Sequence, residues 1–392
     1  MKLLLKNGKI ITPERVLENT DVLTENGKIK SVEANISPDE NIKIIDCLGL
    51  YVSPGFIDMH LHGGGGYDFM DGTEEALVGA TKSHLKYGTT SLVPTTLTCT
   101  DEELFNFFDI YKSVKSKMVD GPNLLGVHLE GPYFSPKQAG AQDPKYLKIP
   151  TPDHYNKILE YSDDIVRISL APELPGALEL GKVLRDRGII ASIGHSDADY
   201  SEVVSAVESG FSHVTHLYSG MSTIHRRNAY RHLGVVESAY LIDELNVEII
   251  ADGCHLPKEL LEFIIKFKEN DKISLVTDSS RGATMPEGSE IVLGSLKNGQ
   301  DCIIENGVAI MPDRTAFAGS VATSDRCVRT MHKLVGLPIE KAVAMMTVNP
   351  ARVLGVDDRK GKIQVGYDAD INIFDDNINI KNVIVGGKVI EM

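Results

Sequence analysis

The chain has 392 residues, which is too long for one minimal domain but suits a large α/β barrel with a small accessory domain. Its 42% hydrophobic and 24% charged residues are ordinary for a globular protein, so disorder is not expected. The formal net charge of −15 argues against a surface that binds nucleic acid or anionic lipid. A local cationic pocket for a small phosphorylated substrate is compatible with this charge. We therefore predict a small-molecule substrate, no nucleic-acid partner and no membrane partner.

The cysteines indicate a reducing compartment, because they are odd in number, widely spaced and form no CxxC pair. Neither Cys99 nor Cys254 lies in a cysteine-protease signature, so no thiol nucleophile is expected. The apolar run at residues 3–5 is too short for the core of a signal peptide, and no stretch approaches the length of a membrane span. We expect a soluble, cytoplasmic protein.

Both ends of the chain are rich in short β-type segments. Near the start, Asn-Gly pairs predict turns at Asn7-Gly8 and Asn26-Gly27. Near the end, three β-rich runs are separated by Gly and Asp, at residues 362–365, 369–374 and 381–389. We predict that the termini meet in one sheet, with residues 1–53 and 361–392 forming a small β-sandwich domain.

Between the termini, short apolar runs alternate with helical stretches, which is typical of βα units around a parallel sheet. There are eight such runs, at residues 56–62, 90–97, 124–130, 166–171, 189–195, 213–217, 247–252 and 273–278. This number predicts a (β/α)8 TIM-like barrel over residues 54–360. The Gly- and Pro-rich interval 281–318 does not continue this alternation of strands and helices, and we predict that it is a β insertion. A helix pair is expected at 324–335 and 339–346.

Polar residues gather at the ends of these runs, where the active site of such a barrel lies. His60 and His62 are two residues apart, so on a strand they share one face and can reach the same metal ion. A pair of buried, hydrogen-bonded histidines is the alternative for such a motif alone. The full set of candidate ligands is His60, His62, Glu130, His195, His216 and Asp278. Imidazole and carboxylate groups predict one or two divalent ions: zinc, iron or manganese.

The same residues predict hydrolytic chemistry. A bound divalent ion lowers the pKa of its water from about 15.7 to near 7, which supplies a nucleophile at neutral pH. Asp278 is then the candidate catalytic acid/base, because a carboxylate there can take a proton from the water and deliver it to a leaving amine. Two further histidines, His128 and His213, are expected to be structural. The glycine run at 63–66 lacks a dinucleotide pattern and is expected only to let backbone approach the site.

Several motifs resemble those of a known family. Pro54 to Asp58, followed by His60 and His62, resembles the first-strand motif of the amidohydrolase superfamily. The stretch HLEGPYFSPKQAGAQ, residues 128–142, resembles a block of the N-acetylglucosamine-6-phosphate deacetylase family. Matching motifs around residues 195, 216, 252, 278 and 319 follow in the order of that family, so the resemblance covers essentially the whole chain.

The resemblance implies a role for each matching residue. Glu130, His195 and His216 would bind metal, and the presence of both His60 and His62 implies the two-metal type, with Glu130 bridging the ions. Arg227 and His255 would hold the phosphate of the sugar. Backbone at the following residues would line the sugar pocket: Ala141, Ser219, Gly220, Phe317, Ala318 and Gly319. As a hypothesis, the side chain of Gln142 would orient the acetamide carbonyl.

The reaction implied is removal of the acetyl group from N-acetylglucosamine-6-phosphate in amino-sugar catabolism, without an organic cofactor. A homodimer is also implied, in which Arg227 or His255 would reach the pocket of the partner. The family commonly has Asn-Ala where this chain has Ser219-Gly220, and Arg-Glu-Pro where it has Arg227-Asn228-Ala229. Arg226 adds a second guanidinium, while Arg231 reads as part of a solvated face.

Because of these departures, three alternatives stay open. The first is deacetylation of N-acetylgalactosamine-6-phosphate. The second is another amidohydrolase reaction, on an N-acyl amino acid or a cyclic amide, and the third is a non-catalytic barrel kept for binding.

Overall fold

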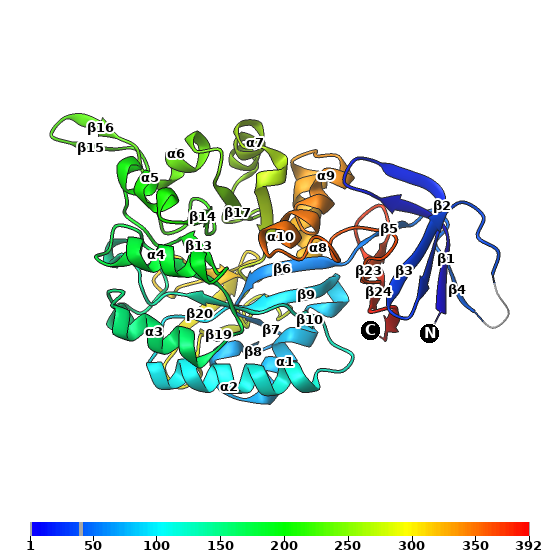
Figure 1. The fold of residues 1–392 in the computed structure, drawn as a ribbon, viewed down its shortest axis with the longest axis horizontal. Coiled ribbons are helices and arrows are strands. Elements are labelled where there is room, and N and C mark those ends of the chain that lie inside the picture. The colour runs from blue at the N-terminus through cyan, green and yellow to red at the C-terminus, as the bar shows by residue number, and fades with distance from the viewer. Residues whose placement is uncertain (1, 39–41, 392) are drawn as a thin grey trace.

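The computed structural model describes residues 2–38 and 42–391. Residue 1, residues 39–41 and residue 392, which belong to the two predicted terminal segments, lie outside this description. Parallel strands occupy the central part of the chain, and helices cover them on the outside (Figure 1). The central strands are β6(Phe56–Leu61), β9(Thr89–Pro94), β10(Asn123–Leu124), β11(Val127–Glu130), β12(Ile165–Leu170), β13(Ile190–Ile193), β14(Phe211–Val214), β17(Asn246–Ile250) and β18(Ile273–Val276). Every one of the eight predicted runs therefore contains a strand.

These strands form a curled parallel sheet in two parts. One part has the order β10-β9-β6 and the other β11-β12-β13-β14-β17-β18, with parallel pairing throughout. The two parts meet on both sides. Thr95 and His128 form a parallel bridge on one side, and on the other the N–H of Asp278 donates to the carbonyl of His60 at 2.9 Å. Strand ends that are far apart in the sequence are thereby brought to one rim.

The outer helices are amphipathic and capped. In α2, Leu104, Phe107, Phe108 and Tyr111 are spaced so that they face the sheet, and all are buried. Thr100 caps the start of this helix in a capping box with Glu103. Among the described residues, no helix combines the length and apolar character needed to cross a bilayer. The α-helices are α1(Glu74–Ser83), α2(Asp101–Lys117), α3(Pro152–Tyr161), α4(Ala177–Asp186), α5(Tyr200–Glu208), α6(Val235–Leu241), α7(Lys258–Phe267), α8(Ser324–Arg329), α9(Ile339–Ala344) and α10(Val348–Val353).

Shorter elements connect these units. A π-helical segment, η6(Thr330–Leu334), continues α8, so the first helix of the predicted pair is present but changes its winding. The 3₁₀ helices are η1(Phe69–Asp71), η2(Leu85–Tyr87), η3(Pro136–Gln138), η4(Pro144–Tyr146) and η5(Asn270–Lys272), and the short strand pairs are β7(Gly63–Gly64) with β8(Tyr67–Asp68) and β15(His225–Arg227) with β16(Tyr230–His232).

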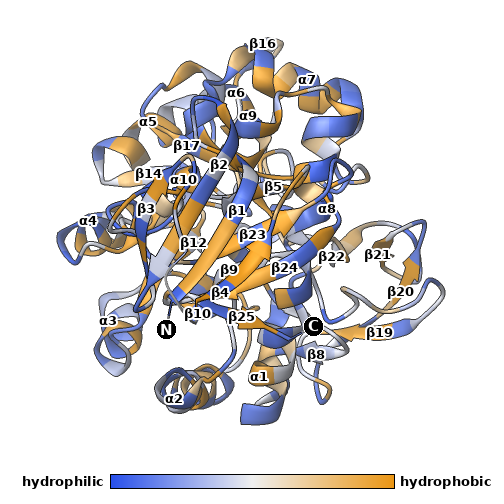
Figure 2. Cartoon of the chain, turned by 90° about the vertical axis from the view of Figure 1, so that its right-hand side faces the viewer, coloured by the Kyte–Doolittle hydropathy of each residue, from blue (hydrophilic) through white to orange (hydrophobic). Residues whose placement is uncertain are grey.

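Strands from both ends of the chain share an eight-stranded mixed sheet, which lies at the right of Figure 1 and nearest the viewer in Figure 2. Its order is β25-β24-β23-β5-β1-β2-β3, with β4 pairing with β1. Apolar stretches such as those of β1 and β23 supply its core. The strands are β1(Lys2–Ile11), β2(Val16–Glu25), β3(Lys28–Glu33), β4(Lys43–Asp46), β5(Tyr51–Pro54), β23(Ile371–Phe374), β24(Ile380–Val385) and β25(Lys388–Ile390).

Two local predictions in this sheet are wrong and one is confirmed. Asn7-Gly8 forms no turn: it is a bulge inside β1, because the chain on both sides of it is buried in the same core, and only Asn7 takes a positive φ, of 60°. Residues 362–365 form no strand, since glycines with φ of 84° and 91° at positions 361 and 366 turn the chain at both ends. Asn26-Gly27 does join β2 to β3, with φ of 50° and 78° as a tight hairpin requires.

The interval predicted as an insertion contains an antiparallel four-stranded sheet: β19(Glu290–Leu293), β20(Gln300–Glu305), β21(Val308–Ile310) and β22(Phe317–Ser320). A buried ion pair fixes this sheet to the central part of the chain. Arg281 lies 2.7 Å from Asp71, and the same guanidinium donates to the carbonyl of Gly294 at 2.7 Å. Leu293 and Phe317 are thereby held over the carboxyl ends of the central strands, where they line the cavity described below.

A buried histidine predicts how stability depends on pH. His213 is fully buried, and burial lowers its pKa to about 3 from 6.5. Between these values the unfolded chain binds a proton that the folded chain does not, so this contribution to stability is complete above pH 6.5 and is lost as the pH falls. We expect urea unfolding to show a steeper loss of stability from pH 6.5 to 5 in the wild type than in His213→Gln, by up to about 1.4 kcal/mol per pH unit. Equal slopes for His213→Gln and the wild type would contradict the expectation.

Candidate metal centre

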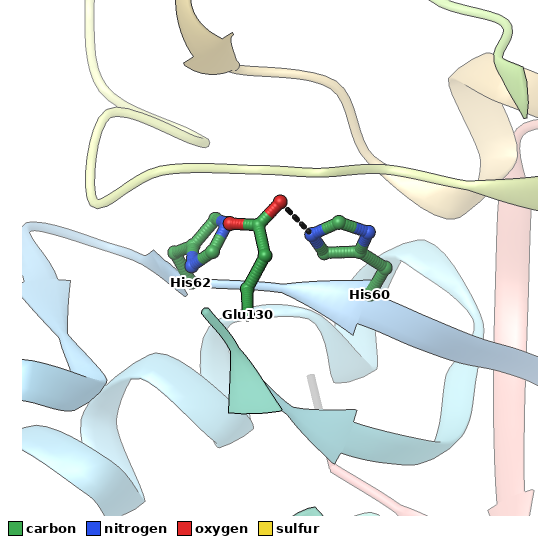
Figure 3. A group of neighbouring side chains, drawn as sticks. All are labelled: His60, His62 and Glu130. Atoms are coloured by element: carbon green, nitrogen blue, oxygen red, sulfur yellow. Dashed lines mark ion pairs between the residues drawn. The ribbon is translucent and has the colours of Figure 1, made fainter. Parts of the chain in front are cut away.

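Four histidines and two carboxylates meet at the carboxyl ends of the central strands. Glu130 lies at their centre: its carboxylate is 3.4 Å from His60, 3.3 Å from His62 and 3.3 Å from His195, each measured to Nε2, and 3.0 Å from Nε2 of His216. Figure 3 shows this carboxylate, which projects from β11, lying between the two imidazole rings at the end of β6. All these side chains are buried. The structure thus brings together the residues that the sequence predicted as ligands.

The cluster divides into two triads that share Glu130. One triad is His60, His62 and Glu130, and the other is Glu130, His195 and His216; in each, the ligand atoms lie within 4.8 Å of one another. Asp278 lies beside the first triad, with Oδ1 3.1 Å from Nε2 of His62 and 3.5 Å from Nε2 of His60. The donors are imidazole nitrogens and carboxylate oxygens, which suit zinc, iron or manganese.

A repeated backbone turn aims three of these side chains inward. His195, His216 and Asp278 each lie two residues beyond the end of their strand, and each has a positive φ, of 48°, 28° and 47°. Such a conformation costs a residue with a Cβ about 1–2 kcal/mol, and it persists only where the surroundings enforce it. The local sequence gives no sign of this turn, which is therefore a property of the assembled strands.

Hydrogen bonds on the far side of two rings orient the nitrogens that face Glu130. Nδ1 of His60 donates to Glu248 at 2.6 Å, and Nδ1 of His195 donates to the carbonyl of Gln138 at 2.7 Å. Nε2 of His60 is buried and makes no hydrogen bond within the described structure. A buried nitrogen that faces two carboxylates without such a bond fits a metal ligand.

The charges in the cluster balance one another. Burial alone would raise the pKa of Glu130, but the surrounding histidines, His60 first among them, hold it well below its usual range. Burial alone would lower the pKa of His62, but hydrogen bonds to Asp278 and Glu130 raise it to about 9. The carboxylates thus attract positive charge into the cluster, and a divalent cation would supply that charge on binding.

A cavity of about 200 Å³ opens above the cluster. Most residues predicted to line a sugar pocket do line it: Ala141, Gln142, Ser219, Gly220, His255, Phe317 and Gly319. Ala318 does not, because it is fully buried in the core of the insertion sheet. Gln142 is engaged by protein groups: its amide N–H donates to Glu130 at 2.7 Å and its oxygen accepts the N–H of Thr98 at 2.9 Å. Its side chain therefore holds Glu130 in place.

Arg227 does not reach this cavity. It lies in the β15–β16 hairpin, which projects from the molecule at the upper left of Figure 1, and its exposed guanidinium pairs with Asp199 at 3.4 Å. Arg226 pairs with Arg231 across the hairpin, and both are exposed. This is the solvated face expected for Arg231, but it lies on a hairpin and not on a helix, because residues 228 and 229 take positive φ and turn the chain. His255, in contrast, lines the cavity: its Nδ1 donates to Asp252 at 2.8 Å and its ring lies 4.7 Å from that of Phe317.

His128 and His213 lie inside the curled sheet, where Ser169 and Ser192 are their respective hydrogen-bond partners. Sequence reasoning missed Glu248, which holds His60, and it noted Asp252 only as part of a motif, without its contact to His255. A charged residue in the middle of the apolar run 247–252 was the available sign for Glu248.

The comparisons with known proteins agree with this geometry. Residues 51–390 match the amidohydrolase family. N-acetylglucosamine-6-phosphate deacetylase of Lysinibacillus sphaericus is 33% identical over 394 residues, which cover 99% of this chain and 98% of that protein. The chain belongs to the N-acetylglucosamine-6-phosphate deacetylase family.

Solved structures of the deacetylase family have the same fold. The crystal structure of the enzyme from Pasteurella multocida is 29% identical, has a TM-score of 0.91 and covers 99% of both chains. A mutant of the Mycobacterium smegmatis enzyme, in complex with N-acetyl-D-glucosamine-6-phosphate, is 28% identical with a TM-score of 0.90 and covers 100% of both chains.

Gly220 lies directly beside one of the candidate ligands. Gly220 has a φ of 55°, and a Cβ there would lie 2.9 Å from Nδ1 of His195. Glycine lets the backbone pass directly beside this ring, so we expect that alanine could be accommodated only by a shift of His195.

Proposed function

We propose that this chain hydrolyses the acetamide of N-acetylglucosamine-6-phosphate to glucosamine-6-phosphate and acetate, a step of amino-sugar catabolism. The observation that carries the proposal is the six-residue cluster of four histidines, Glu130 and Asp278 in a chain of the deacetylase family. The cavity directly above the cluster has room for a small substrate.

We infer that divalent ions occupy the two triads, with zinc, iron and manganese as the candidates and Glu130 shared between the sites. A bound ion of this kind polarises an amide carbonyl and lowers the pKa of water. Asp278, whose carboxylate faces the same space, accepts the proton of the attacking water. As the C–N bond breaks, Asp278 returns that proton to the departing nitrogen, so amine and acetate leave.

The cavity walls position the sugar. His255 lines the cavity and its ring is held through Nδ1 by Asp252. In the imidazolium form the ring carries a second N–H, at Nε2, which would donate to a phosphate oxygen. The insertion sheet contributes Leu293 and Phe317 to the lining of the cavity. We further propose that a homodimer forms, in which Arg227 of the partner subunit completes the phosphate site, since the projecting hairpin keeps this residue outside its own cavity.

The same proposal includes a division of the chain. Residues 54–360 would form a complete (β/α)8 barrel, and residues 1–53 and 361–392 a small β domain, in a cytoplasmic enzyme. The free cysteines fit a reducing compartment.

The decisive experiment is release of acetate from N-acetylglucosamine-6-phosphate, run beside the unphosphorylated and galacto compounds and repeated after chelation and return of metal. We expect release that depends on phosphate and is restored by metal. Faster turnover of the galacto compound would assign the chain to that sugar. Turnover of only N-acyl amino acids or cyclic amides would refute the phosphate site, and full metal loading without turnover of any acylated amine would favour a binding protein.

His255 offers a separate test of phosphate recognition. We expect His255→Asn to raise KM for the phosphorylated sugar about tenfold, because one hydrogen bond to a charged group contributes roughly 1.5–3 kcal/mol, while kcat changes little. Replacing Arg185, an exposed arginine of α4 that pairs with Asp186, should leave KM unchanged. An unaltered KM in His255→Asn would place the phosphate elsewhere.

A further inference from the structure

A buried carboxylate lies directly behind the candidate metal centre. Glu248, in β17, is fully buried. Its Oε1 accepts the Nδ1 proton of His60 at 2.6 Å, and the same oxygen accepts the backbone N–H of His216 at 3.0 Å. His60 belongs to one triad and His216 to the other. A single oxygen atom therefore holds one residue of each triad.

The other oxygen of this carboxylate is held by an arginine that is also fully buried. Arg167, in β12, donates through Nη1 to Oε2 of Glu248 at 2.5 Å. Its Nη2 donates to the hydroxyl groups of Ser192 and Thr215, at 3.2 and 3.0 Å. A buried carboxylate persists in the charged form only when it is paired and hydrogen-bonded. Arg167 thus pairs with one oxygen of Glu248, and the other oxygen accepts both hydrogen bonds from the metal-site side.

The contact with His60 has a consequence for metal binding. An imidazole offers one nitrogen to a metal, and the hydrogen bond at the other nitrogen decides which one. With Nδ1 committed to Glu248, Nε2 of His60 faces Glu130 at 3.4 Å. The contact with His216 acts on the backbone instead, at a residue whose φ of 28° is otherwise unfavourable.

We propose that Glu248 is a positioning residue that aligns both metal subsites, through the ring of His60 and the backbone of His216, with Arg167 as its counter-ion. This inference rests on the proposed function, because it needs divalent ions in the two triads. Glu248 itself does not line the cavity.

The test is titration of the metal-free protein with Co²⁺, followed by visible absorption, in the wild type and three variants. We expect Glu248→Gln to lower cobalt affinity 10- to 100-fold, as loss of such an outer hydrogen bond does elsewhere, and to change the cobalt spectrum. Ser192→Ala, which alters the same network on the side away from His60, should keep the wild-type affinity and spectrum. Circular dichroism melts show whether each variant is folded.

The double variant Glu248→Gln/Arg167→Met distinguishes two effects of Glu248: alignment of His60 and His216, and charge balance with Arg167. If Glu248→Gln does not fold, the double variant provides the test. Removing both charges should restore the thermal midpoint but leave cobalt binding weak. Wild-type affinity and spectrum in folded Glu248→Gln, or their full recovery in the double variant, would overturn the inference alone. A wild-type protein that binds no cobalt would overturn the metal centre and, with it, this inference.

Discussion

Glu130→Gln should lose both metal ions and nearly all turnover. Glu130 is the residue common to the two triads, and its carboxylate lies within 3.4 Å of all four histidines. A neutral amide removes the anionic donor and places N–H groups toward nitrogens that must face a cation. We expect affinity for Zn²⁺ to fall by more than about 100-fold, beyond the typical cost of an outer-shell change. Metal content by mass spectrometry, after dialysis against a zinc buffer, is the measurement.

Single-triad variants provide the matched comparison for this result. His62→Asn should remove one ion, since His62 belongs only to the first triad, and His195→Asn should remove the other. If Glu130→Gln retained a full ion, the shared-ligand arrangement would be incorrect. If His62→Asn and the wild type bound the same single ion, the chain would have one functional site.

Asp278→Asn should keep its metal but lose turnover by about 10²- to 10⁴-fold in kcat, the usual contribution of a general acid/base. The asparagine has nearly the same shape and lies at the same backbone position, but it cannot accept the proton of water or return one to the amine. The carboxylate lies 3.1 Å from His62 and borders the cavity. It is therefore next to the proposed position of the amide bond of the substrate. Steady-state acetate release and metal content, measured on the same preparation, separate chemistry from loading.

A buried aspartate far from the site controls for the general effect of such a substitution. Asp21, in the terminal sheet, pairs with Lys6 at 2.8 Å. Asp21→Asn should lower thermal stability and leave kcat unchanged. Near-normal turnover by fully loaded Asp278→Asn would refute the proposed acid/base role.

Much of the fold was predictable because its signals are local. Each central strand coincides with a short, mainly apolar run of the sequence, and the position of a polar residue at the end of such a run predicts which rim it occupies. Glu130 and His195 are 65 residues apart in the sequence, yet both follow from this rule. The residues of the cluster could therefore be named without knowledge of any contact.

Other features depend on what the strands pack against. The bulge at Asn7-Gly8 replaces a turn because the core continues on both sides of it, which no Asn-Gly pair reveals. The exposed position of Arg227 depends on the projection of a hairpin. Glu248 was overlooked because its partners, His60 and Arg167, come from distant strands.

The sheet built from both ends of the chain has a consequence for biosynthesis. β5, at residues 51–54, pairs with β23, at residues 371–374. At about 5–20 residues per second, a ribosome needs on the order of tens of seconds to travel between them. Throughout that time the early strands present an open edge of the kind that recruits other nascent chains. We therefore expect the newborn protein to depend on chaperones, and a premature stop codon before β23 to yield insoluble product even though every metal-site residue has been made.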